Sequence, residues 1–252
     1  AAAAARMGAS VALITMDHND PGTLSCNPAI GGIGKGHLVC EINALGGLMG
    51  RVADAAALQS RILNRSKGPA VHGPRAQVDR RRYRAAMGTA LAEFDHLTVI
   101  VAQVQALTFD GETVVGVETN LGTVRATAVV LTTGTFLGGV MHRGDAKAIG
   151  GRDGAAASHL GEQLRVLGLP VSRLKTGTPP RLDACSIDWG RLGWQVGDED
   201  RPSFSGAVAP ATPPLPCAIT RTTPATHAII RENLPKSALY GGHINSVGPR
   251  YC

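Results

Sequence analysis

Short apolar runs, separated by glycine turns, alternate with polar positions along the chain and predict an α/β protein. The first residues indicate a helix ending at Gly8, followed by a strand at Ser10–Thr15. Later strands, each bounded by turn residues, are expected at Leu97–Val101, Val104–Phe109, Val114–Glu118 and Val124–Thr132. Further helices are expected at His37–Met49, Arg75–Phe94, Gly154–Leu167 and His227–Asn233. This succession favours a largely parallel sheet.

Two of the expected helices have a periodic apolar face. In the helix His37–Met49 one face carries Leu38, Ile42 and Leu45, and Gly46-Gly47 closes the element. In the helix Arg75–Phe94 the arginines at 80–82 point outward, and the inward side chains are Val78, Ala85 and Leu91.

The stretch from Arg201 to Pro216 differs from the rest, because it holds five prolines and has no strong periodicity. We interpret it as an extended connection or the edge of an inserted subdomain. Residues 1–200 then form one domain, and residues 201–252 begin a second. The chain opens within a helix, without an initiator Met, and stops just after a turn at Gly248–Arg250. We therefore expect a fragment that lacks both ends.

Composition narrows the class of protein. The five cysteines are an odd number, and none belongs to a C-x-x-C pair, so a disulfide framework or a zinc site is disfavoured. The histidines form no H-E-x-x-H motif, and we expect no catalytic metal. No uncharged run is long and apolar enough to span a bilayer. The sequence thus predicts a cytoplasmic protein without a membrane segment.

The positive charge is concentrated in one part of the chain. Between Arg61 and Arg84 there are eight Lys or Arg and a single acid, Asp79, while the whole chain has a net charge of +6. Such an excess favours a polyanionic partner, because bound phosphates release their counterions. A solvated helix face explains the charge equally well.

The segment Ser25–Gly36 is the most informative motif. Four of its last six residues are glycines ahead of an expected helix, as a phosphate contact requires. Close packing of that helix on the sheet is the alternative. The segment matches neither a Walker loop nor G-x-G-x-x-G. Cys26, just before the glycines, is a candidate nucleophile, although a single cysteine is more often an inert small hydrophobe.

A second candidate contact region is the β-branched run Val129–Thr135, which ends in Thr-Gly. In flavoproteins with two dinucleotide sites, a strand of this kind returns the chain beneath the cofactor. Thr132 and Gly134 are therefore candidate cofactor-binding residues.

Several runs occur together and in a fixed order: Ser25–Leu38, Ala44–Met49, Asn64–Val71, Arg75–Gln77, Val130–Leu137, Arg173–Arg181 and Val247–Cys252. In this order they resemble the family of bacterial glucose-inhibited division protein A, the flavoenzymes of tRNA uridine 5-carboxymethylaminomethyl modification (MnmG). The resemblance covers essentially the whole chain but less than half of a full-length member.

The resemblance implies an FAD/NAD(P)-binding Rossmann-like fold of the glutathione-reductase type, with part of an inserted NAD-binding domain. It also implies FAD and NAD(H) as cofactors, methylenetetrahydrofolate as one-carbon donor and the wobble uridine of certain tRNAs as substrate. A GTPase of the MnmE type is the implied partner, with a homodimer inside a heterotetramer. A cysteine thiolate is expected to activate C5 of the uracil by adding to C6.

Site residues follow from the motifs that match the family's. Cys26 and Cys252 match its two motif cysteines, and either is a candidate nucleophile. Val104 and Ser158 fall at FAD-contacting positions. The opening of the NAD-binding segment corresponds to Gly248, Pro249, Arg250 and Tyr251. Four cations in matching motifs are expected to contact phosphates or to form structural ion pairs: Lys67, Arg75, Lys175 and Arg181.

One departure from the family pattern bears on the cofactor. The family's G-G-G-H-A-G fingerprint, which cradles the FAD pyrophosphate, is absent from this sequence. The chain alone is therefore expected to bind FAD poorly and to be inactive. Two alternatives remain open: a folate- and FAD-dependent tRNA uridine methyltransferase, and an inactive truncated module that binds RNA or phosphate.

Overall fold

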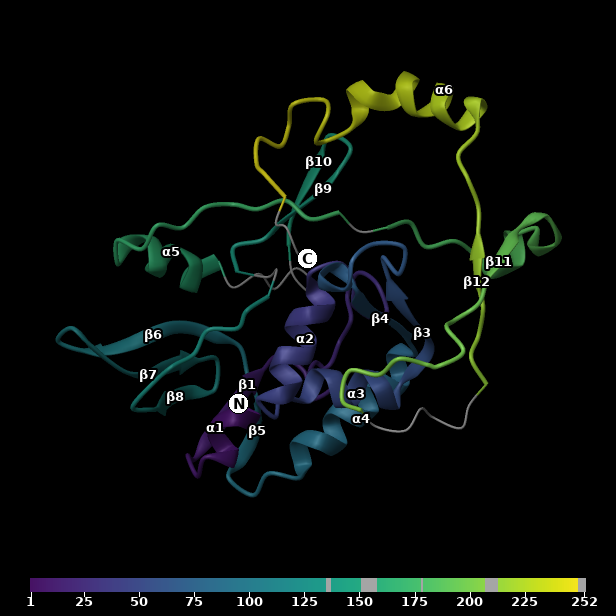
Figure 1. Ribbon diagram of the computed structural model, residues 1–252. Coiled ribbons are helices and arrows are strands. Elements are labelled where there is room, and N and C mark those ends of the chain that lie inside the picture. The colour runs from purple at the N-terminus through teal and green to yellow at the C-terminus, as the bar shows by residue number, and fades with distance from the viewer. Residues whose placement is uncertain (135–136, 151–157, 178, 207–212, 249–252) are drawn as a thin grey trace.

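A computed structural model of the chain describes residues 1–134, 137–150, 158–177, 179–206 and 213–248 (Figure 1). It contains both parallel and antiparallel sheets with helices packed against them, which confirms the α/β class. Parallel pairing is not predominant, however. Among the described strands, only β1 (Val11–Thr15) and β5 (Leu97–Val101) pair in parallel, so the expectation of a largely parallel sheet is wrong.

The parallel pair lies near the start of the chain. The helix α1 (Ala2–Arg6) precedes β1, as the sequence predicted, and Val11 pairs with Leu97. The pairing continues beyond the strands, because the amide of Ala102 donates to the carbonyl of Thr15 at 2.9 Å. The next strand, β6 (Val104–Asp110), therefore starts beside the carboxyl end of β1.

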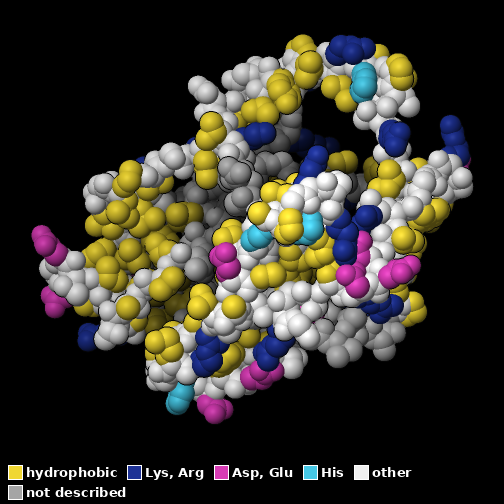
Figure 2. Space-filling view, viewed as in Figure 1, with side chains coloured by type: hydrophobic (Ala, Val, Ile, Leu, Met, Phe, Trp, Pro, Cys, Tyr) yellow, Lys and Arg dark blue, Asp and Glu magenta, His cyan; other side chains and the backbone are white. Residues whose placement is uncertain are grey.

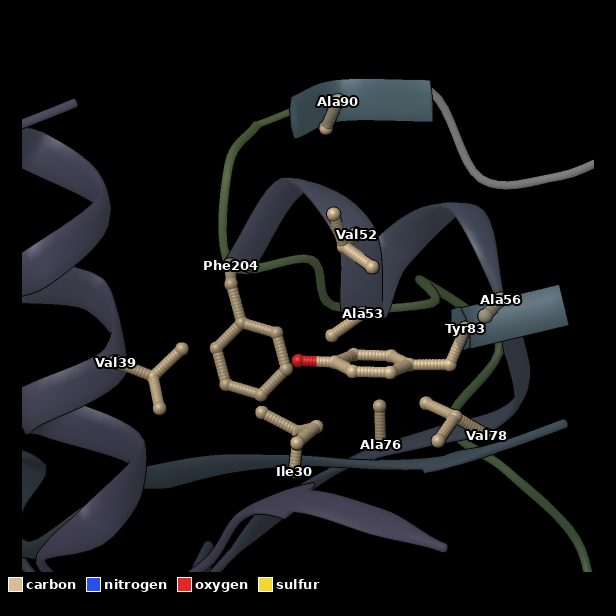
Figure 3. Packing of buried hydrophobic residues seen from close by; sticks show 10 residues of the cluster. All are labelled: Ile30, Val39, Val52, Ala53, Ala56, Ala76, Val78, Tyr83, Ala90 and Phe204. Carbon is tan, nitrogen blue, oxygen red and sulfur yellow. The ribbon is translucent and has the colours of Figure 1, made fainter. Parts of the chain in front are cut away.

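The centre of the molecule is an antiparallel sheet of β2 (Ala29–Gly31), β4 (Gly73–Val78) and β3 (Ala57–Leu63). The helices beside it are α2 (Lys35–Ala44), α3 (Leu48–Ala55) and α4 (Arg80–Ala92). Their side chains enclose the main core, in which the rings of Tyr83 and Phe204 lie among Ile30, Val39 and Val52 (Figure 3). Burial raises the pKa of Tyr83 to about 12.

The expected helix Arg75–Phe94 is wrong in its first part. Residues 75–78 belong to β4, because they pair with β3, and Val78 is buried from a strand rather than a helix. The helix α4 begins only after Asp79, whose carboxylate accepts from the amides of Arg81 (2.8 Å) and Arg82 (2.9 Å) as an N-cap. Leu91 is buried as expected, whereas Ala85 is exposed.

The expected helix His37–Met49 is in fact two helices. α2 ends at Ala44, Gly46 takes a φ of +78°, and α3 starts at Leu48. The predicted apolar face of α2 is exposed, namely Leu38, Ile42 and Leu45, and Val39 is the residue that packs into the core. Both α3 and β3 were missed by the sequence pattern.

A separate antiparallel sheet holds β6, β7 (Thr113–Thr119) and β8 (Gly122–Arg125), confirming the predicted strands and turns up to Arg125. The helix α5 (Ser158–Val166) covers it, and Gln163 both accepts from and donates to the backbone of Leu107 at 2.7 and 2.9 Å. Hydrophobic side chains gather over this region (Figure 2). Residues 126–134 form no strand, so that part of the prediction is wrong; Val130 is 83% exposed.

The remaining elements are small. The hairpin of β9 (Val140–Arg143) and β10 (Ala146–Ile149) and the pair β11 (Gly193–Gln195) and β12 (Cys217–Ile219) are both antiparallel. In the described residues, 3₁₀ turns lie at Pro69–Val71, Ala184–Ser186, Trp189–Arg191 and Leu234–Lys236. The predicted last helix is α6 (Pro224–Asn233), which begins with a capping box between Thr223 and Thr226.

The proline-rich stretch 201–216 has neither helix nor strand in its described part, as expected for an extended connection. Its Phe204 nevertheless packs into the main core, because buried Asp54 of α3 accepts from the amides of Phe204 (2.9 Å) and Ser205 (2.8 Å). The proposed domain boundary after residue 200 stays a prediction. Within the described ranges, no helix has the length and apolarity needed to cross a membrane.

Candidate functional site

The segment Ser25–Gly36 runs from the loop after β1 through β2 into α2. Two of its glycines are required by packing, because a Cβ at Gly31 or Gly36 would overlap the carbonyl oxygen of Pro74. Gly32 differs: it has a φ of +122°, and only the guanidinium of Arg75 comes near its missing side chain. Close packing therefore explains part of the motif, and the surface at Gly32 faces a cation.

Two arginines hold the loop at Cys26. Arg80, the first residue of α4, donates to the carbonyl of Cys26 at 2.7 Å, and Arg181 donates to the carbonyl of Ser25 at 3.0 Å. The Cys26 thiol is half-buried beside these contacts. The two guanidinium groups fix the backbone on both sides of the Ser25–Cys26 peptide bond and so restrict where the thiol lies.

The run Arg173–Arg181 also contacts two further motifs. The amide of Lys175 donates to the carbonyl of Val247 at 3.0 Å, and Gly248 lies against the same lysine. Arg173 donates to the carbonyl of Gly138 at 2.9 Å. The structure thus brings the Cys26 loop and the start of the segment Gly248–Cys252 to one connecting run. Pro249, Arg250, Tyr251 and Cys252 lie outside the described residues.

The candidate cofactor-binding residues are spread over three elements. Val104 is half-buried at the start of β6, next to the carboxyl ends of β1 and β5, where ligands of open α/β sheets bind. Thr132 and Gly134 are exposed and outside any strand. Ser158 opens α5, and its side chain lies outside the described atoms.

Sequence reasoning missed one acid at the same sheet edge. Asp17 follows β1 by two residues, the place where doubly wound folds carry the acid that holds a ribose. Its carboxylate accepts from the amide of Asn19 at 2.8 Å. An acid directly after the predicted strand Ser10–Thr15 was the signal available in the sequence.

These residues fit FAD only in part. The sheet edge with Asp17 and Val104 suits the adenosine end of a dinucleotide, but the 252 residues contain no G-x-G-x-x-G loop for the pyrophosphate. As for metals, the described residues contain no cluster of three or more His, Cys, Asp or Glu side chains placed to hold one.

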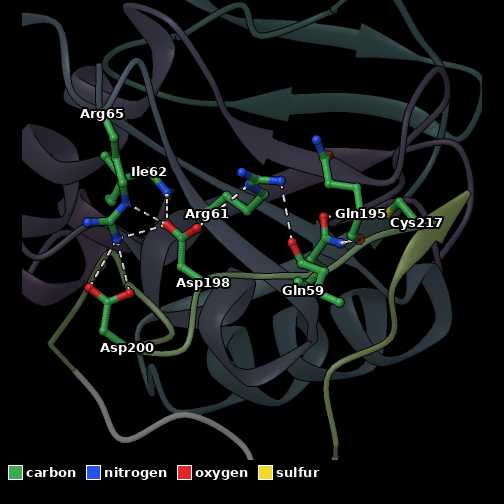
Figure 4. A network of polar contacts seen from close by, with 9 residues as sticks. Gln59, Arg61, Ile62, Arg65, Gln195, Asp198, Asp200 and Cys217 are labelled. Atoms are coloured by element: carbon green, nitrogen blue, oxygen red, sulfur yellow. Dashed lines mark hydrogen bonds and ion pairs between the residues drawn. The ribbon is translucent and has the colours of Figure 1, made fainter. Parts of the chain in front are cut away.

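The arginines of the basic run Arg61–Arg84 fall into two groups: some form ion pairs, and others line a groove. Arg65 binds Asp198 at 2.8 Å and Asp200 at 3.0 Å, and Arg61 lies 3.7 Å from Asp198 (Figure 4). Partial burial works to raise the pKa of Asp198, but the amide of Ile62 and the guanidinium of Arg65 lower it below its ordinary value. These two arginines therefore act mainly in structural ion pairs.

Other arginines of the run line a groove of about 750 Å³ between α4 and β5. Arg81, Arg82 and Arg84 lie at its rim together with His18, and its apolar floor includes Leu91, Leu97 and Val99. The carboxylate of Asp79 also lines it, but this group caps α4. If the basic run binds a polyanion, this groove is the part of it that we expect to do so. Arg80, which holds the Cys26 carbonyl, precedes the groove's arginines on the same helix.

Cys40 differs from Cys26 in its surroundings. Burial raises the pKa of the Cys40 thiol, and the carboxylates of Asp54 and Glu41 raise it further. A thiol held in its protonated form is a poor nucleophile. This environment makes Cys40 a poor candidate for the nucleophile.

Comparison with known proteins decides the family. The profile described as "Glucose inhibited division protein A" matches residues 1–252. The chain belongs to this family. It is 51% identical over its whole length to the tRNA uridine 5-carboxymethylaminomethyl modification enzyme MnmG of Zymomonas mobilis, and covers 41% of that protein.

Two solved structures of GidA from Aquifex aeolicus agree with this assignment. The form I crystal superposes with a TM-score of 0.88 at 45% identity, covering 99% of this chain and 43% of the other. The form II crystal gives 0.85 at 43% identity, covering 93% and 41%. The chain thus shares the GidA fold over nearly all its length, and spans less than half of these relatives.

Proposed function

We propose that this chain takes part in modifying the wobble uridine of certain tRNAs, adding a carboxymethylaminomethyl or aminomethyl group at C5. The carrying observation is the loop at Cys26, itself in a run that matches the GidA family, fixed by Arg80 and by Arg181 of a second such run. The printed name of the Zymomonas relative, a tRNA uridine 5-carboxymethylaminomethyl modification enzyme, supports the same chemistry. The proposed substrate, tRNA, is found in the cytoplasm, which is also where the chain is expected to be located.

In this proposal Cys26 is the nucleophile. Its thiolate adds to C6 of the uracil ring, and the electrons of the C5–C6 double bond move toward the C4 carbonyl, which makes C5 nucleophilic. C5 then attacks the methylene carbon of the one-carbon donor in its iminium form, and the electrons of the donor's C=N double bond move to its nitrogen. Loss of the C5 proton restores the C5–C6 double bond and breaks the C6–S bond, which returns the thiolate. Glycine or ammonia then replaces the donor nitrogen on the methylene carbon, and the donor leaves as its free amine. Cys252, the other motif cysteine, is the competing candidate for this role.

The remaining components come from the family. FAD and NAD(H) are the proposed cofactors, and methylenetetrahydrofolate is the proposed one-carbon donor. A GTPase of the MnmE type is the proposed partner, in a heterotetramer built on a homodimer of the GidA-type chains. On this chain, Val104 and the sheet edge beside it are the proposed FAD contacts, together with Thr132, Gly134 and Ser158. The NAD(H) contacts proposed are Gly248, Pro249, Arg250 and Tyr251.

The basic groove supplies the proposed contact to tRNA. Arg81 and Arg84 lie at its rim on α4, and Arg80 of the same helix holds the Cys26 carbonyl. An RNA strand whose phosphates follow the groove lies along the helix whose first residue holds the Cys26 carbonyl. Phosphate contacts of this kind position an RNA without reading its sequence.

Deleting the gene that encodes this chain tests the proposal. We expect total tRNA from the deletion strain to lack the C5 substituent at wobble uridines, as measured by mass analysis of nucleosides and anticodon fragments. A plasmid copy of the gene should restore it. Wobble uridines that stay fully modified, with loss of a C5 methyl group outside the anticodon, would assign the chain to the folate-dependent methyltransferases instead.

A further inference from the structure

The two tryptophans of the chain lie on its surface and stack on each other. The ring centroids of Trp189 and Trp194 are 6.0 Å apart and their planes differ by 13°. The two residues remain 43% and 55% exposed. Because large aromatic side chains carry much apolar area, an exposed and ordered pair is a feature of binding surfaces.

Hydrogen bonds to the backbone fix the positions of the two rings. Trp189 donates from its indole nitrogen to the carbonyl of Ala184 at 3.1 Å, and Trp194 lies on β11. The segment around β11 and β12 is anchored to β3. Gln59 donates to the carbonyl of Gln195 at 2.7 Å (Figure 4), and the amide of Asp198 donates to the carbonyl of Ser60 at 2.9 Å. The exposure of the rings therefore belongs to a fixed surface.

Beside the pair is an open hollow of about 520 Å³, lined by both Trp194 and Arg61. The hollow also has Gly193, Gly197 and Ile219 in its walls. Asp198 is present too, but its carboxylate is bound by Arg65 at 2.8 Å and lies 3.7 Å from Arg61. The ring of Trp194 thus shares one hollow with the guanidinium of Arg61, which also donates to the carbonyl of Val196 at 3.4 Å.

A ligand that suits this hollow has a flat ring and an anionic group, which is the chemistry of a nucleotide. Arg191 and Arg221, on the segments that carry the tryptophans and β12, are both exposed and add positive charge. Val196 and Ile219 also line the hollow and add apolar area against which the flat face of a base can pack. We infer that Trp189 and Trp194 form a stacking platform for an unpaired base of the tRNA substrate, which rests on the proposed function.

The position of the platform suits this role. Trp189 follows Arg181 by eight residues, and Arg181 holds the carbonyl of Ser25. The connecting segment spans at most about 28 Å, and a fixed turn at Ala184–Ser186, capped by Asp183, shortens it. A single strand of a few nucleotides reaches from the Cys26 loop to the platform, so a base near the modified uridine occupies it.

The experiment uses the intrinsic fluorescence of the chain, since both of its tryptophans belong to the platform. An unmodified anticodon stem-loop RNA should change the fluorescence in a saturable manner, with the midpoint that filter retention gives for binding. A blunt RNA duplex of equal length should bind without this change, because its bases are already stacked. Dilution of the chain alone should leave the signal constant, whereas a concentration-dependent signal would mean that a second copy covers the pair and would overturn the inference.

Variants separate stacking from charge. Trp194→Ala should weaken stem-loop binding roughly 5- to 100-fold, without altering the slope of log affinity against log salt. Trp194→Phe should retain most of the affinity, which guards against a folding defect. Tyr240→Ala, a change at another exposed ring (74%), serves as the matched control and should leave binding unchanged.

The outcomes distinguish the inference from the function on which it rests. If the stem-loop binds tightly with no change in fluorescence, and Trp194→Ala binds as the unaltered chain does, the platform is refuted while the proposed function stands. If tRNA does not bind at all, both fail. Weakened binding by Trp194→Ala, together with the fluorescence change on single-stranded bases, supports the platform.

Discussion

Arg181 donates a hydrogen bond to the carbonyl oxygen of Ser25 at 3.0 Å, although the two residues are 156 positions apart. This contact joins the run Arg173–Arg181 to the loop of Cys26. Lys175 of the same run contacts Val247, so a single extended segment links two motifs that carry the candidate nucleophiles. The run Arg173–Arg181 is short and bonds to the backbone of both motifs. We therefore expect it to hold the Cys26 loop in position.

Replacing Arg181 tests that role. Arg181→Ala should lower the free energy of unfolding by less than about 1.5 kcal/mol, because it removes one exposed hydrogen bond. Modification of wobble uridine should fall by on the order of 10–100-fold, since a displaced reactive group is costly in rate. Both are measured on variant genes returned to the deletion strain and on purified protein. Arg165→Ala, which removes an exposed pair with Glu162, is the control and should change neither.

Asp54 is predicted to be essential for the fold. Its buried carboxylate accepts from the amides of Phe204 and Ser205 and from the Ser205 hydroxyl (2.6 Å). Asp54→Ala should reduce the free energy of unfolding by about 3 kcal/mol or more, because buried donors lose a charged acceptor. Urea denaturation measures the change. Glu93→Gln, at an exposed pair with Arg51, should cost less than about 1 kcal/mol; an equal loss in both variants would refute the anchoring role.

The stability of the chain should fall in acid partly through Asp79. The amide of Arg82, with help from that of Arg81, lowers the pKa of the Asp79 carboxyl below its ordinary value of about 3.9. A lowered folded pKa means that this stabilisation is complete above the ordinary value and is lost as pH falls through the folded pKa. Asp198, whose pKa is also lowered, contributes in the same direction.

Asp79→Asn isolates this contribution. Asparagine caps helices about as well as aspartate, so the variant should keep most of its stability at neutral pH. Its free energy of unfolding should fall less steeply than that of the unaltered chain between about pH 5 and pH 2. Urea denaturation at a series of pH values gives the comparison. Coincident pH profiles for the two proteins would contradict the assignment.

Sequence patterns predicted the strands β5, β6 and β7 well, because alternation and tight turns are local signals. They failed where pairing decided the outcome: residues 75–78 have the composition of a helix but pair with β3. At Val129–Thr132 the β-branched residues predicted a strand, but none forms, because no neighbouring strand among the described elements pairs with them.

The site was predictable only through motif resemblance. The bonds from Arg80 and Arg181 end on main-chain carbonyls, and such acceptors have no signature in the sequence. The contacts of the basic run Arg61–Arg84 could not be predicted from the sequence either. Its charge was evident, but Arg65 pairs with Asp198 and Asp200, which lie 133 and 135 positions away in the sequence. The groove at α4 likewise depends on elements that come together only in the fold.

The purified chain should contain far less than one flavin per molecule. It has the sheet edge at Val104 but no G-x-G-x-x-G loop for the pyrophosphate. Absorbance of the purified protein, and of flavin released by denaturation, measures the content. A yellow protein with stoichiometric FAD would show that the residues present suffice to hold the cofactor.

The most direct test of the central claim is the wobble-uridine content of the deletion strain carrying Cys26→Ser. Serine keeps the size of the side chain but supplies no thiolate, so we expect the C5 substituent to be absent from tRNA although the protein accumulates normally. Cys40→Ser, at the thiol whose pKa burial raises, should restore the modification fully. Full modification by the Cys26→Ser protein would contradict the placement of the chemistry at this loop.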